Sequence, residues 1–151
     1  MDSFVVFMHV IAGTIIVSMS SIMQLIVGPA VSLLPEGLDK KRLTEKLAKR
    51  RIPIMDSAIM IQMTSAMYLL YSRWIMISLE PVMIAKACCG FIGLSLAFSA
   101  HFYFRGKKKK LQAEGRLSEL KTLNEKTRFI EPLVLVLASC AYFLGVFFNH
   151  M

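Results

Sequence analysis

Long apolar stretches separated by two strongly basic stretches dominate this 151-residue sequence. Sixteen of the 18 basic side chains fall within residues 36–51 and 105–128. The hydrocarbon core of a bilayer is about 30 Å thick, and a helix that crosses it needs about 20 apolar residues. Backbone groups must satisfy one another inside lipid, so a long apolar stretch predicts a helix. Four such helices are expected, at about residues 4–34, 52–71, 81–104 and 129–148.

The distribution of charge predicts how these helices are oriented. Residues 36–51 carry seven basic and three acidic side chains, and residues 105–128 carry nine basic and three acidic ones. The positive-inside rule makes both stretches cytoplasmic loops, and both termini then lie outside. We therefore expect an all-α protein, a polytopic membrane four-helix bundle in which residues 1–151 form a single transmembrane domain. The expected location is a bacterial-type inner (plasma) membrane, crossed several times.

Composition excludes several classes of protein. With 56% hydrophobic and 19% charged residues, the chain is too apolar for a disordered protein. It has three cysteines without CxxC spacing, which excludes covalent attachment of a c-type haem. The four lysines 107–110 stand beside no nucleic-acid reading motif, so we expect them to set topology and to contact anionic lipids, not nucleic acid. Whether the chain is an enzyme stays open.

Ionisable residues within the apolar stretches are the candidate functional residues, because each costs free energy in a bilayer. Lys86 lies five residues after Pro81, and His9 lies six residues into the first helix. At 1.5 Å per residue both lie about 8 Å inside their helix starts. This shared depth predicts an outer-leaflet site for a haem iron and its propionate, a metal or a quinone oxygen. Alternatively, Lys86 extends to the outer headgroups and His9 is a hydrogen-bonded packing residue.

Two further groups of side chains have both a functional and a structural interpretation. A proton-entry group or a second cofactor ligand is one interpretation of Asp56, His101 and Glu131 at the cytoplasmic end. The other is that the carboxylates complement helix dipoles and that the histidine belongs to an aromatic belt. The thioethers of a helical stripe suit copper(I), although methionine also fills gaps in packing. That stripe consists of Met60, Met63 and Met67.

Four segments carry a family resemblance. They are FMHVIAGTIIV with His9, VGPAVSLLP at 27–35, KRRIPIMDSAIMIQMTSAMYLLY at 49–71, and MIAKACCGFIGLSLAFSAHFYF at 83–104 with Lys86 and His101. In layout the chain resembles small inner-membrane proteins of the CopD/HemJ type, although residues 17–20 replace the Trp-x-Gly element of that family. The resemblance implies a haem or porphyrin site at His9 and Lys86, with haem b as cofactor. In CopD-like relatives the associated theme is copper handling.

Three functions follow as expectations. The first is a haem-binding or porphyrin/redox-handling membrane protein, with His9 and Lys86 as the site and His101 as a further ligand. The second is a non-catalytic subunit or interaction protein of a larger membrane complex, whose basic stretches dock onto an acidic partner or lipid. The third is a copper-handling transporter in which the methionine stripe and His9 bind the metal. Such a transporter is expected to act as a homodimer.

Overall fold

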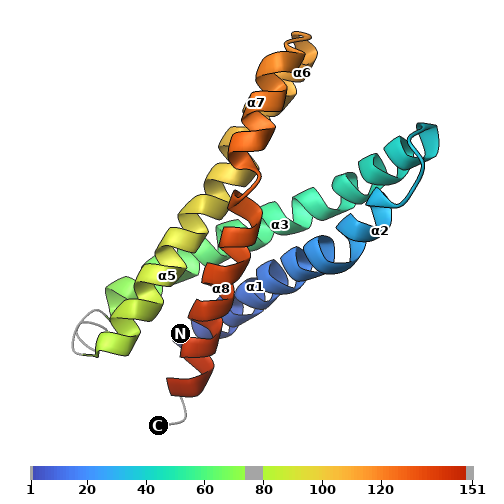
Figure 1. Ribbon diagram of the computed structural model, residues 1–151. Helices are drawn as coiled ribbons and strands as arrows, with labels where there is room; N and C mark the ends of the chain where they lie inside the picture. Colours follow the sequence, from blue (N-terminus) through green and yellow to red (C-terminus); the bar gives the residue numbers. More distant parts are fainter. Residues whose placement is uncertain (1, 74–79, 149–151) are drawn as a thin grey trace. The chain divides into compact units, whose positions relative to one another are not determined.

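The structure of the chain is a computed structural model that describes residues 2–73 and 80–148 (Figure 1). All regular secondary structure within these residues is helical, which confirms the all-α prediction for them. The described residues group into two compact units, within residues 1–74 and 75–151. The elements are α1 (Asp2–Ile22), the π-helix η1 (Met23–Val27), α2 (Gly28–Ser32), α3 (Leu38–Ser72), α5 (Pro81–Phe98), the π-helix η2 (Ser99–Phe104), α6 (Arg105–Ala113), α7 (Leu117–Thr127) and α8 (Ile130–Phe148).

The first unit is a helical hairpin in which α3 packs back along α1, and we call it the first hairpin. Before the chain reverses, α1 passes through the π-helical turn η1. Pro29 lacks a backbone N–H and its ring crowds the carbonyl one turn earlier, so the backbone widens locally. The Gly28 N–H then donates to the Met23 carbonyl oxygen. A Cβ at Gly28 would lie 2.9 Å from that oxygen, so this close approach requires glycine.

The basic residues before position 52 are helical, whereas the sequence predicted a loop there. Helix α3 begins at Leu38 and runs for 35 residues, with Pro53 in its interior. Leucine, lysine, arginine, glutamate and alanine make up most of residues 38–51, and all five are good helix formers. The predicted start at residue 52 was therefore wrong, because charge sets the side of the membrane without preventing helix formation.

The second unit, which we call the second hairpin, contains two long helical stretches joined by a tight turn. The first stretch combines α5, η2 and α6, and the second combines α7 and α8, with α8 packed against α5 and α7 against α6 (Figure 1). Only a two-residue turn at 128–129 separates α7 from α8. The predicted cytoplasmic loop at 105–128 is thus mostly helical.

The turn at the tip of the second hairpin has the geometry of a Schellman motif. Gly115 has a φ of 69°, a left-handed conformation that glycine adopts without strain. Its N–H donates to the Gln112 carbonyl, and the Arg116 N–H donates to the Leu111 carbonyl. Arg116 Nε also donates to the Glu119 carboxylate at 2.7 Å. The hydrogen bonds that Arg116 donates to Glu119 and to Glu114 raise its pKa above the usual value, so the guanidinium stays charged.

Three helical stretches among the described residues are long and apolar enough to cross a membrane, namely 3–32, 81–113 and 117–145. The expected fourth span, at 52–71, is not one of them. Its polar residues, which include Asp56, Gln62 and Thr64, lower the hydropathy of α3. Length and composition therefore support membrane location for three of the four predicted spans.

Candidate functional site

A cluster of hydrogen-bonded polar side chains lies between α1 and α3. His9 Nδ1 is 3.0 Å from Ser65 Oγ, and His9 Nε2 is 3.1 Å from Gln62 Nε2. Ser65 has a single hydroxyl proton, which it donates to the Ile61 carbonyl at 2.7 Å. The hydroxyl therefore accepts from His9 Nδ1–H, while the Gln62 amide donates to His9 Nε2. Both ring nitrogens of a neutral His9 are engaged within the first hairpin.

The cluster is packed against the α1 backbone and largely buried. A Cβ at Gly13, one turn after His9, would lie 3.5 Å from both heteroatoms of the Gln62 amide, which is an ordinary van der Waals contact. Ser65 is buried, with 7% of its surface exposed. The side-chain oxygen Oε1 of Gln62 is also buried and has no hydrogen-bond partner among the described residues. The cluster therefore retains one acceptor that the hairpin does not use.

The sequence predicted His9 but missed Gln62 and Ser65. The methionine stripe proposed as a copper(I) site lies on another face of α3. Two of its members, Met60 and Met67, are 47% and 64% exposed. The residues that face α1 belong to a different series with the same helical spacing. That series is Met55, Ala58, Ile59, Gln62 and Ser65. Its small and polar members were the available signal.

Lys86 is engaged in the second hairpin. A Cβ at Gly145 of α8 would lie 2.8 Å from Lys86 Nζ and 3.0 Å from its Cε. The lysine side chain of α5 therefore lies across the surface that Gly145 leaves bare. Lys86 and His9 belong to different compact units. Their predicted pairing concerns how the units meet, and it stays a prediction.

Further along the same interface, α5 and α8 approach each other through small residues. A Cβ at Gly93 would lie 3.2 Å from Leu137 Cβ and 3.7 Å from the Ala138 backbone nitrogen. These two contact points set an antiparallel register. One turn further along, Ala97 and Val134 come opposite each other in that register, and both are buried. Such small-residue interfaces are typical of helices that pack in membranes.

The predicted cytoplasmic cluster draws on both units. Asp56 lies in α3, whereas His101 lies in the π-helical turn η2 and Glu131 in the first turn of α8. All three side chains have interactions within the chain. Beside His101, the Phe98 and Phe102 rings lie 4.7 Å apart, as in the aromatic belt that the sequence offered as an alternative. No group of three His, Cys, Asp or Glu side chains in the part of the chain that the structure describes is placed to hold a metal ion.

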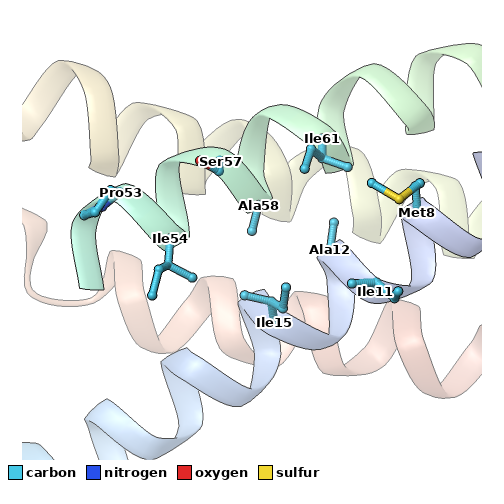
Figure 2. Close-up of a pocket in the computed structure, with 9 residues that line it drawn as sticks. All are labelled: Met8, Ile11, Ala12, Ile15, Pro53, Ile54, Ser57, Ala58 and Ile61. Atoms are coloured by element: carbon cyan, nitrogen blue, oxygen red, sulfur yellow. The ribbon is translucent and has the colours of Figure 1, made fainter. Parts of the chain in front are cut away.

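An apolar groove runs between α1 and α3 (Figure 2), and none of the three side chains of the His9 cluster lines it. Its volume is about 390 Å³. Its lining consists of Met8, Ile11, Ala12, Ile15, Pro53, Ile54, Ser57, Ala58 and Ile61. None of the predicted site residues lines it.

Comparison with protein-family models, curated proteins and solved structures finds no match to this chain. The CopD/HemJ resemblance therefore rests on the sequence segments that carry it and stays a prediction.

Proposed function

We propose that this chain is a non-catalytic membrane subunit whose two helical hairpins present basic helical extensions to an acidic partner protein. The observation that carries the proposal is that the basic residues 105–128 are mostly helical. Of the nine basic side chains there, seven lie on the paired helices α6 and α7, which continue α5 and α8, and Arg116 and Arg128 lie in the turns beside them. A helical arm loses little conformational entropy on binding, which favours a docking role.

The length of the second hairpin supports such an arm. The helical stretch from Pro81 has 33 residues, which corresponds to about 50 Å at 1.5 Å per residue. The hydrocarbon core accounts for about 30 Å of this, and a full bilayer with headgroups is about 40–45 Å thick. An upright hairpin therefore carries its tip beyond the headgroups on one side. Lys107 to Lys110 follow Pro81 by 26–29 residues, or about 39–44 Å, so they reach the headgroup surface just before the tip.

The charges of the arm are available for a partner. Arg116 is engaged by Glu114 and Glu119. By contrast, the side chains of residues 107–109 make no hydrogen bond or ion pair within the described residues. Consecutive side chains of a helix point about 100° apart, so these three lysines give most of the circumference of α6 a positive charge, which complementary carboxylates steer toward.

The proposed topology has four membrane crossings. Both basic helical extensions, residues 38–51 of α3 and residues 105–128, lie in the cytoplasm, and both termini lie outside. Packing supports the fourth crossing, although hydropathy alone does not find it. Helix α3 contacts α1 from Ile54 to Ser65, so this part of α3 shares the depth of a helix that is apolar enough to span. The positive-inside rule then places residues 38–51 and the α6/α7 tip on the same side. We propose a bacterial-type inner membrane as the location, with the four helices forming one domain.

The surroundings of His9 do not fit a haem. An iron ligand needs one ring nitrogen directed at the metal, whereas His9 Nε2 meets the Gln62 amide and Nδ1 meets Ser65. The neighbouring apolar groove is lined by other residues. The methionines proposed for copper include two that are largely exposed. Haem b and copper stay predictions, and the interaction role is the function that the geometry supports best.

Zero-length carbodiimide crosslinking in intact membranes tests this proposal, because it joins lysine amines to carboxylates in direct contact. We expect residues 107–110 to crosslink reproducibly to an acidic segment of one other protein. The triple variant K107Q/K108Q/K109Q should lose the larger species on a native gel in mild detergent. The charge-preserving variant K107R/K108R/K109R should retain it.

A topology reporter at the C-terminus checks that both variants keep the same orientation. Crosslinks confined to this chain, or a glutamine variant that retains the complex, would contradict the proposal.

A further inference from the structure

The groove between α1 and α3 has a shape set by two small residues. Ala12 and Ala58 are 2% and 3% exposed and form its floor, with larger side chains along the sides (Figure 2). Met8 and Ile61 lie at one end, and Pro53 lies at the other. The volume of about 390 Å³ falls within the range of about 300–1,000 Å³ that small-molecule sites occupy.

The lining selects an apolar, elongated occupant. Ser57 contributes the one polar side chain among its nine lining residues. The groove follows α1 for about two turns and α3 for a little more than two, which corresponds to about 10–12 Å. An acyl chain has this form and chemistry. A polar solute would find hardly any hydrogen-bond partners there.

A basic side chain stands at the Pro53 end of the groove. Arg50 precedes Ile54 by four residues and Ser57 by seven, so it continues the same face of α3 as the groove wall. Its neighbour Lys49 lies about 100° away around the helix. Arg50 is exposed, and the planar guanidinium group binds phosphate with paired hydrogen bonds. The apolar wall of the groove and the phosphate-binding group of Arg50 thus lie one after the other along the same face of α3.

We infer that this groove binds one anionic phospholipid, with an acyl chain lying over Ala12 and Ala58 and the headgroup phosphate at Arg50. The site goes beyond the proposed docking role. It rests on the proposed membrane embedding of the first hairpin but not on the acidic partner. Removing Lys107 to Lys109 therefore leaves lipid binding unchanged, and the two proposals fail separately.

Native mass spectrometry of the delipidated full-length protein tests the inference. Phosphatidylglycerol and phosphatidylcholine with identical acyl chains are the probes. We expect one retained phosphatidylglycerol per chain, favoured about fivefold over phosphatidylcholine, as one basic side chain near an anionic headgroup provides. R50Q should reduce this preference to about one, while K49Q, which removes the same charge from another face, should preserve it.

A second variant tests the apolar part of the site. S57L fills the groove from an exposed position, and it should lower retention of both lipids while circular dichroism shows unchanged helix content. Equal retention of the two lipids by the wild-type protein would overturn the inference. It would also be overturned if K49Q acted like R50Q, or if S57L retained lipid as the wild-type protein does. Extraction by alkaline carbonate, which strips proteins that do not span, would instead overturn the membrane embedding itself.

Discussion

In the first hairpin a hydrogen-bonded cluster adds to the apolar contact of α1 with α3, whereas in the second α5 meets α8 through glycine and alanine. His9, Gln62 and Ser65 connect the first pair. Gly93 and Gly145 allow close approach in the second pair. Hydrogen bonds between membrane helices contribute about 0.6 kcal/mol each on average. Close packing depends instead on many weak contacts that a single extra side chain disrupts. The first hairpin should therefore be sensitive to lost polar groups, and the second to added volume.

Gly93→Leu should produce the largest effect. The first added carbon would already lie 3.2 Å from Leu137 Cβ, and the rest of the side chain must force the helices apart. We expect a loss of about 3 kcal/mol in the free energy of unfolding, the upper part of the usual range for overpacking. Unfolding by dodecyl sulfate in mixed micelles, followed by circular dichroism, measures it.

Gly90→Leu is the matched control for this variant, because a Cβ at Gly90 meets nothing within 4 Å. Equal losses in both variants would show that helix propensity, and not the α5/α8 contact, determines the effect.

His9→Ala should produce the next largest effect, because it removes both hydrogen bonds of the cluster. We expect a loss of about 1–2 kcal/mol in the free energy of unfolding. Thr14→Ala is a suitable control, since Thr14 Oγ1 bonds only to the Val10 carbonyl of its own helix at 2.8 Å and its loss should change little. The same two samples test the haem prediction.

Because both His9 nitrogens are engaged within the hairpin, we expect the absorption spectrum to be the same with and without His9. A Soret band that disappears in His9→Ala, but not in Thr14→Ala, would support haem ligation instead.

The helices themselves could be predicted from the sequence because long apolar stretches permit little else in a bilayer. Their boundaries could not. The charge of residues 36–51 and 105–128 predicts loops, but their lysine, glutamate and leucine content also favours helix. The tip turn was missed for a related reason, since its hydrogen bonds at Gly115 and Arg116 depend on where α6 ends.

Of the candidate site, the sequence identified single residues and not their partners. His9 and Lys86 attract attention because ionisable groups are rare in apolar stretches. Gln62 and Gly145 are ordinary at their positions, and only the register of each hairpin brings them to the ionisable residues. That register comes from packing along whole helices, for example at Gly93 against Leu137, which no short motif encodes.

The turns of the two hairpins differ in what they require of glycine, and this predicts a smaller effect. Gly115 has a φ of 69°, so Gly115→Ala should cost about 1 kcal/mol, the usual penalty for a side chain in the left-handed region. Gly37, before α3, has a φ of 172°, which is extended backbone that any residue adopts. Gly37→Ala should therefore be nearly neutral in the same unfolding assay. A comparable loss in both variants would remove the distinction between the turns.

Gly145→Ala should produce the smallest effect, although its Cβ would approach its neighbour more closely than at any other described α5/α8 contact of a glycine. The atoms at 2.8 and 3.0 Å are Nζ and Cε of Lys86, the far end of a flexible side chain that can rotate away. We expect a loss below about 1 kcal/mol, within the range of substitutions that leave a core intact. In a double-mutant cycle with Lys86→Ala the cost of Gly145→Ala should disappear, because the atoms that it displaces are gone. If the cost persisted without Lys86, the α8 backbone itself would require glycine, and the lysine would not be positioned by this contact.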